Sequence, residues 1–219
     1  MPKHNKSLKY KTDQRAFVLD RIAQEKQKPL DTLQPLVLEC FGGFGMIFAH
    51  CYREVDARGA TMDMDKEKVK MLARQRRDWI VARGDNAKLI GAGFCHWIPF
   101  DIIDADAFGS PWPVVNGWIQ TDRMRAQRTW IVATDGLSYK FKQTGTARIK
   151  DANISAVTQK YGDEYMRSNY PDVAREILDL AIAGKGLEIA YWNFHTGGNQ
   201  KVSHWTAALD VVSSAAAGK

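Results

Sequence analysis

The sequence lacks the features of several protein classes. No apolar run approaches the roughly 18 residues that a membrane-spanning helix needs, and residues 1–15 lack the apolar stretch of a secretory signal peptide. The three cysteines are too few and too irregularly spaced for a structural zinc site or a disulfide framework. We therefore expect no membrane partner, no bound metal and a cytoplasmic location, with Cys40 and Cys51 as buried thiols.

The composition is that of a globular protein with an uneven charge. The chain has 219 residues, of which 45% are apolar and 26% charged, enough for an ordinary core. Residues 1–30 hold eight basic and three acidic residues, a net +5 of the chain's +6. We predict a basic N-terminal arm with a leading helix over residues 1–34 and a second unit over 35–219. Such an arm is typical of a protein with an anionic partner, and a solvated tail is the alternative.

Apolar strand patterns alternate with helical patterns along the chain. Strands are expected at 36–41, 59–63, 79–82, 100–106 and 129–135, with helices at 12–27, 46–55, 65–77, 113–124, 151–160 and 171–183. This alternation predicts a parallel sheet with helices on both faces. Two last strands, at 187–194 and 204–212, are joined by too few residues for a crossover helix. They are therefore expected to form an antiparallel hairpin.

A glycine-rich turn follows the first strand. Its pattern, Glu39-x-Phe41-x-Gly43-x-Gly45, leaves backbone open to a ligand at the start of a helix. Asp63 ends the second strand, where a carboxylate can accept hydrogen bonds from ribose hydroxyls. The dinucleotide pattern G-x-G-x-x-G is broken because Phe48 stands at its third glycine.

With these motifs, residues 35–215 resemble class I S-adenosylmethionine-dependent methyltransferases. The resemblance implies a seven-stranded, mostly parallel Rossmann-like sheet that ends in an antiparallel hairpin. It also implies that S-adenosylmethionine is the cofactor, with the glycine loop against its methionine part and Asp63 on its ribose. The motif Gly84-Asp85-Asn86 would contact the adenine. The cofactor residues expected on this basis are Glu39, Phe41, Gly43, Gly45, Asp63, Asp85, Asn86 and Asp104.

The segment around the fourth strand is the most specific. Residues 101–113, DIIDADAFGSPWP, are similar to the D-x-D-P-[FY]-G-[ST]-P-x-P segment of tRNA guanine N2-dimethyltransferases. Thr134-Asp135 after the fifth strand adds to this likeness. It implies that Asp106 holds an exocyclic base amine and that Phe108 stacks on the base, which is flipped or unpaired. Ala107 departs from the family, which has proline there.

The expected function is methylation of an exocyclic amine in a nucleic acid, RNA before DNA. Trp112 is expected to face the substrate, and Lys140 and Lys142 to contact phosphates. His195 and His204, which flank the hairpin loop, are candidates for the mouth of the site. Ala107 and the lack of room for a large RNA-binding domain leave two alternatives. These are a small-molecule or protein methyltransferase and a cofactor-binding module without base-methylating activity. The oligomeric state is left open.

Overall fold

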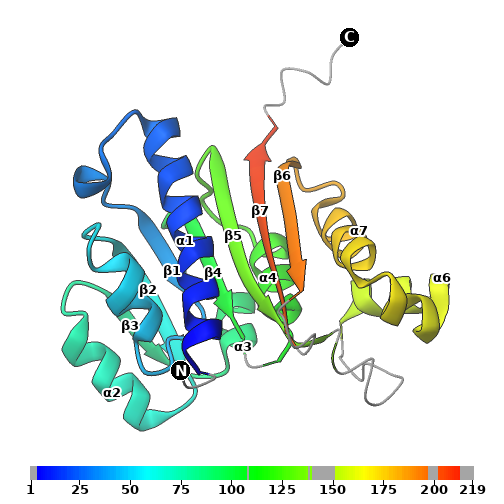
Figure 1. The fold of residues 1–219 in the computed structure, drawn as a ribbon, viewed down its shortest axis with the longest axis horizontal. Coiled ribbons are helices and arrows are strands. Elements are labelled where there is room, and N and C mark those ends of the chain that lie inside the picture. Colours follow the sequence, from blue (N-terminus) through cyan, green and yellow to red (C-terminus); the bar gives the residue numbers. More distant parts are fainter. Residues whose placement is uncertain (1–3, 108, 138, 140–150, 197–201, 213–219) are drawn as a thin grey trace.

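The chain folds around one seven-stranded sheet (Figure 1). The computed structural model describes residues 4–107, 109–137, 139, 151–196 and 202–212. The strand order is β3-β2-β1-β4-β5-β7-β6. Five strands are parallel, and β7 runs antiparallel to both β5 and β6. The strands are β1 (Leu36–Glu39), β2 (Arg58–Asp63), β3 (Ile80–Arg83), β4 (Ile102–Asp106), β5 (Arg128–Asp135), β6 (Leu187–Thr196) and β7 (Ser203–Val211).

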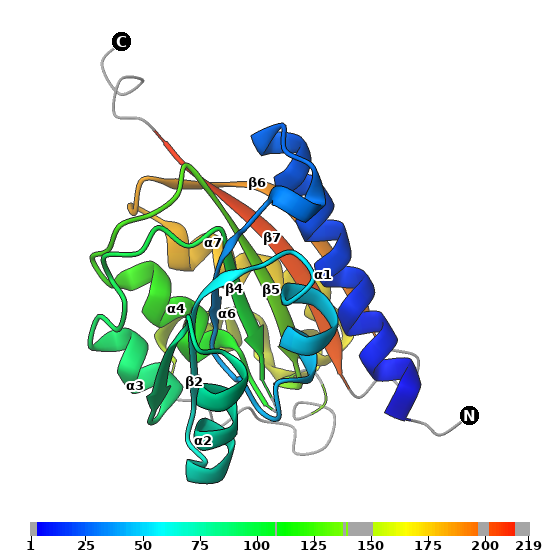
Figure 2. The ribbon, with the colours of Figure 1, turned by 90° about the vertical axis from the view of Figure 1, so that its left-hand side faces the viewer.

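Helices cover both faces of the sheet (Figure 2). One face carries α1 (His4–Lys26) and η2 (Phe48–Tyr52), a π-helix. The other carries α3 (Asn86–Gly91), α4 (Trp112–Gln120) and α7 (Tyr170–Ile182), with α6 (Ala152–Ser168) against α7. The remaining helices are η1 (Leu30–Thr32), a 3-10 turn, and α2 (Lys66–Gln75), which packs on β2 and β3. The expected fold class, a mostly parallel sheet with a C-terminal antiparallel hairpin, is confirmed.

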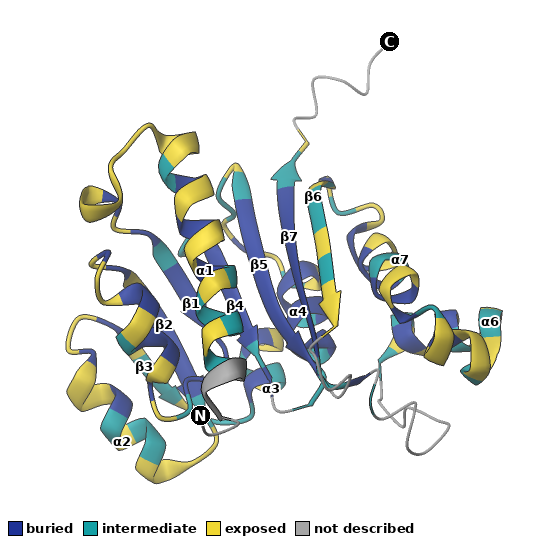
Figure 3. Ribbon diagram, in the orientation of Figure 1, coloured by how far each residue is buried: buried dark blue, intermediate teal, exposed yellow. Residues whose placement is uncertain are grey.

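Two apolar clusters, one on each face, hold these layers together. The strands of the sheet centre are buried almost throughout, whereas the helices alternate between buried and exposed positions (Figure 3). This follows from the apolar runs of residues 36–38 in β1 and 130–133 in β5, which suit strands covered on both sides. Helix α2 begins at Lys66 because the carboxylate of the preceding residue, Asp65, accepts hydrogen bonds from the backbone N–H groups of Glu67 and Lys68.

The N-terminal segment differs from the expected basic arm. Helix α1 is 23 residues long and starts at His4 rather than Thr12. Val18, Leu19 and Ile22 are buried in the cluster on its face of the sheet. Residues 8–26 thus pack onto the domain, because an apolar stripe and internal ion pairs attach the helix to the sheet. The charges of Lys11, Arg15 and Lys26 are paired with acids in β4 or just before it.

No helix in the described part of the chain is long and apolar enough to cross a membrane. This part also contains no group of three or more His, Cys, Asp or Glu side chains that could hold a metal ion. The three cysteines are free and buried, as expected for Cys40 and Cys51.

Candidate functional site

The sequence motifs meet where the parallel strands end, which we call the carboxyl edge (lower side of Figure 1). The glycine loop follows β1, Asp63 ends β2 and Asp106 ends β4. The first turns of α1 reach the same edge. In open α/β sheets ligands bind at this edge, in the crevice beyond the strand ends.

The glycine loop is shaped by two left-handed residues, Gly43 with φ 53° and Gly45 with φ 72°. Gly43 N–H donates a 3.0 Å hydrogen bond to Asp63 Oδ2. The other oxygen, Oδ1, accepts one of 2.9 Å from Asp65 N–H. A Cβ on Gly43 would have no atom closer than Phe41 O at 3.8 Å. The backbone at Gly43 is therefore open to a ligand, and partly exposed Asp63 lies directly beside it.

Glu39 is buried, and its carboxylate is bound by neighbouring side chains. It forms an ion pair with buried Arg76 and accepts a 3.0 Å hydrogen bond from the Thr61 hydroxyl. Burial raises the pKa of Glu39, and the charge of Arg76 opposes that rise. Arg76 also lies over the rings of Phe48 and Trp79. This carboxylate holds the end of β1 to the helix layer.

Three more of the expected cofactor residues directly follow β1 or β3 at the same edge. Asp85, partly exposed, caps α3 by accepting a hydrogen bond of 3.0 Å from Lys88 N–H. Asn86 is buried, and its side-chain oxygen has no hydrogen-bond partner among the described residues. Phe41 is half-buried and packs on the apolar cluster of the α4 face. The side-chain oxygen of Asn86 is therefore free to accept a hydrogen bond from a ligand.

Asp104 and Trp112 are not where the sequence-based interpretation placed them. Both oxygens of buried Asp104 are bound by Arg15, at 2.9 and 2.5 Å, and Tyr52 OH lies 2.5 Å from one of them. It is an internal ion-pair partner beneath α1, because its pleat position faces that helix. Trp112 is fully buried, stacks on Trp205 and donates a 3.0 Å hydrogen bond to Asp135, so it faces the core and not a substrate. Phe108, Lys140 and Lys142 lie outside the described residues.

Asp106 is paired with a residue that the sequence-based interpretation missed. Lys11 Nζ lies 2.6 Å from Asp106 Oδ1 and 2.9 Å from Oδ2. Burial alone would raise the pKa of Asp106, but the charges of Arg15 and Lys11 outweigh it and lower that pKa. A hydrogen bond from the Thr134 hydroxyl acts in the same direction. Asp106 is thus an ionised carboxylate, and 14% of its side chain is exposed.

A row of polar residues extends from Asp106 across four strands. The register places Asp106 opposite Thr134, Thr134 opposite His204, and His204 opposite His195. Directly opposed residues share a face, here the α1 face. The Thr134 hydroxyl is 3.3 Å from His204 Nδ1. Burial lowers the pKa of His204 to about 4, and the charges of Lys11 and Arg15 add to that effect, so the ring is neutral at neutral pH.

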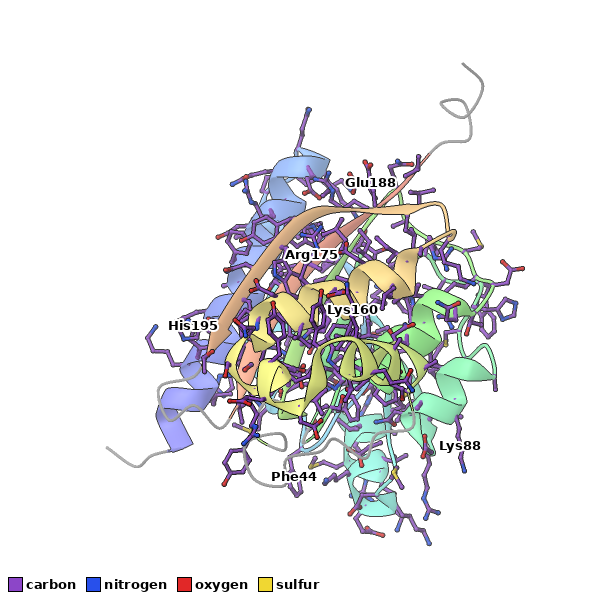
Figure 4. The ribbon with its side chains drawn as sticks, turned by 90° about the vertical axis from the view of Figure 1, so that its right-hand side faces the viewer. Phe44, Lys88, Lys160, Arg175, Glu188 and His195 are labelled. Atoms are coloured by element: carbon purple, nitrogen blue, oxygen red, sulfur yellow. The ribbon has the colours of Figure 1, made fainter. Side chains whose placement is uncertain are left out.

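Helix α1 covers this row. The ring of Tyr10 stacks on His195 with 4.3 Å between ring centroids and lies 4.8 Å from His204. His195 lies near the end of β6, beside the first turns of α1 (Figure 4). Next to the row, a cleft of about 180 Å³ separates the helix from the hairpin. Its lining consists of Tyr10, Asp13, Gln14, Phe17, Asn193, His204 and Thr206.

The two bases of α1 match the two acids of β4 in spacing. Lys11 and Arg15 are one helical turn apart, about 6 Å along the axis, and Asp104 and Asp106 are about 6.6 Å apart on one face of the strand. Two acids at i and i+2 in a strand flanked by helices need two bases nearby. That requirement was visible in the sequence, but no local pattern says which of its 31 basic residues meet it.

The chain is similar to known proteins in structure but not in sequence. No model of a known protein family and no curated protein matches the sequence. The solved structures similar to the chain include the plantazolicin methyltransferase BamL, in complex with a triazolic desmethylPZN analog and SAH. It has a TM-score of 0.59 and 11% identity, covering 96% of this chain and 88% of that one.

Two further solved structures are similar to the chain. M. jannaschii TYW2 in complex with AdoMet has a TM-score of 0.52 and 8% identity, covering 91% of this chain and 77% of the other. A putative O-methyltransferase from Klebsiella pneumoniae has a TM-score of 0.52 and 13% identity, covering 94% and 90%. The particular likeness to tRNA guanine dimethyltransferases remains a likeness of sequence motifs. The chain has the fold of the class I S-adenosylmethionine-dependent methyltransferases.

Proposed function

We propose that the protein is a methyltransferase that uses S-adenosylmethionine. The observation that carries this proposal is the pairing of Gly43 N–H with Asp63 at the carboxyl edge. It forms an open backbone turn next to a partly exposed carboxylate, in a fold whose similar structures include complexes with AdoMet and SAH.

The residues at this edge fit such a cofactor. Gly43 leaves space for the amino-acid part, because no side chain fills the position of its missing Cβ. Each oxygen of Asp63 uses one hydrogen bond, so lone pairs remain for two ribose hydroxyls. The unpartnered oxygen of Asn86 suits an adenine amino group, with Asp85 beside it. When bound, the cofactor would supply an electrophilic methyl group on a sulfonium.

The finer proposal concerns the acceptor, an exocyclic amine of a nucleic-acid base, with RNA favoured. Asp106 supports it, because an ionised, partly exposed carboxylate at the end of β4 can accept an N–H hydrogen bond and orient the nitrogen lone pair. The D-A-D-A-F-G-S-P sequence around it supports it as well. In this proposal Phe108 stacks on the base, and Lys140 and Lys142 contact phosphates.

A second candidate, methylation of a small molecule or a protein, is favoured by the use that α1 makes of its charges. Lys9, Lys11, Arg15 and Lys26 each form an ion pair within the domain, with Asp13, Asp106, Asp104 and Asp101 respectively. Charges neutralised in this way contribute less to the attraction of phosphates.

One experiment tests the proposed acceptor and separates the candidates. The purified protein is incubated with methyl-labelled S-adenosylmethionine and, separately, tRNA, rRNA, DNA, and a mixture of small amines and peptides. We expect label in RNA and its loss in Asp106→Ala. Full activity of that variant would remove Asp106 from the mechanism. Label only in small molecules or peptides, with no binding to nucleic acid at low salt, would favour the second candidate.

A further inference from the structure

The ion pairs under α1 determine the charge of the acceptor site. Two bases on α1, Lys11 and Arg15, meet two acids on β4, Asp106 and Asp104. The Arg15–Asp104 pair is fully buried, and burial and the charge of Asp104 raise the pKa of Tyr52, so its hydroxyl stays neutral. His204, which lies across the sheet from Asp106 with Thr134 between them, is also neutral at pH 7.

Two other titratable groups lie farther from Asp106. His195 lies beyond His204 in the row and is stacked on Tyr10. Asp13 is paired with Lys9 on the exposed side of α1. The immediate surroundings of Asp106 therefore hold two positive and two negative charges before any substrate enters.

Asp106 can still accept a substrate group. A carboxylate offers about four lone-pair sites, of which Lys11 and the Thr134 hydroxyl occupy some. The remaining capacity suits one N–H donor. A neutral amine adds no charge to a balanced, mostly buried site. An aliphatic ammonium adds an unpaired positive charge next to Lys11 and Arg15, which is costly where water is scarce.

We propose that Lys11 is a specificity-determining residue, which balances the charge of Asp106 and thereby selects neutral amines over ammonium ions. The acceptor class is an amino group conjugated to an aromatic ring, as on a nucleobase, and not an alkylammonium such as a lysine side chain or a polyamine. This inference rests on the proposed function, because it assumes that the acceptor binds at Asp106.

The test compares two probes on protein saturated with S-adenosylhomocysteine. Ligand-observed NMR titrations use 9-methyladenine as the neutral amine and butylammonium chloride as the cation. We expect the wild type to prefer 9-methyladenine by at least about tenfold, since one unpaired charge at close range has a large effect. Lys11→Met should lower this preference about tenfold or more, while Lys11→Arg should keep it.

Two further variants make the result unambiguous. Lys9→Met removes a lysine charge from the same helix at an exposed pair, so its preference should equal that of the wild type. Lys11→Gln is measured beside Lys11→Met as a second uncharged variant, and should act in the same direction. An unchanged preference in every uncharged Lys11 variant that folds, a wild type that prefers butylammonium, or no binding of either probe would overturn the proposal. Failure to bind S-adenosylhomocysteine would instead contradict the proposed function itself.

Discussion

Lys11 Nζ lies 2.6 Å from Asp106 Oδ1, although 95 positions separate the two residues in the chain. This contact joins the N-terminal helix to the end of β4. The helix thus becomes one wall of the candidate acceptor site, beside the edge where the glycine loop and Asp63 meet. The contact ties the stability of the fold to the chemistry of the site.

Replacing Asp63 should weaken cofactor binding. In Asp63→Ala, the ribose hydroxyls lose their acceptor and Gly43 N–H loses its partner, so we expect the affinity for S-adenosylhomocysteine to fall at least about tenfold, the equivalent of one or two hydrogen bonds. Calorimetric titration measures it. Asp65→Ala is the matched control. It removes the cap of α2, which lowers thermal stability, and should leave the affinity near that of the wild type.

Adding a methyl group to the glycine loop should block the ligand without disrupting the core. Gly43→Ala meets no close atom, so its stability cost is that of a left-handed alanine, about 1 kcal/mol. Its affinity for S-adenosylhomocysteine should fall strongly. Gly42→Ala would instead place its Cβ 2.5 Å from the Thr61 hydroxyl oxygen and mainly destabilise the fold. If Gly43→Ala bound as tightly as the wild type, the ligand would not approach this turn.

Removing one partner of the buried Arg15–Asp104 pair should destabilise the fold more than removing both. Arg15→Met leaves Asp104 as an uncompensated buried charge, which costs about 3–5 kcal/mol. Urea unfolding measures this loss. The double variant Arg15→Met/Asp104→Leu should recover a large part of it, since apolar replacement of both partners is often neutral. A single variant as stable as the wild type would mean that α1 is not held by this pair.

His204 should make stability depend on pH. Its folded pKa of about 4 is lower than its ordinary value of 6.5, so the unfolded chain binds the proton more readily. Its contribution is therefore complete above pH 6.5 and is lost as the pH falls toward 4, by about 3 kcal/mol in total.

The measurement is the unfolding free energy of the wild type minus that of His204→Gln, from pH 7 to 4. This difference should fall as the pH falls. Thr134→Val, which removes the hydroxyl beside the ring but keeps the histidine, should retain most of the dependence. A difference that stays constant across this range would show that His204 titrates normally in the folded protein.

Local patterns were sufficient for the order of the seven strands, although they did not predict the short helix α3 (Asn86–Gly91). The alternation of strand and helix patterns and the short connection between β6 and β7 predicted a parallel sheet with an antiparallel hairpin. The glycine loop and Asp63 were predicted for the same reason, since strand ends and turns are determined by nearby residues. Both are adjacent in the structure.

Residues whose roles depend on distant partners could not be predicted in this way. Asp104 shares a face with Asp106, yet only the path of α1 shows that Arg15 binds it. Trp112 is buried against Trp205 of β7, and Asp135 in β5 accepts a hydrogen bond from its indole N–H. Lys11 was included in an arm because the first residues of α1 have few apolar side chains, and its contact with Asp106 is long-range.

The central claim is that the carboxyl edge binds S-adenosylmethionine. Calorimetric titration of the wild type with S-adenosylhomocysteine tests it most directly, because the method needs no knowledge of the acceptor. We predict saturable binding of one molecule per chain, weakened by Asp63→Ala and unaffected by Asp65→Ala. No detectable binding to the folded wild-type protein would contradict the claim.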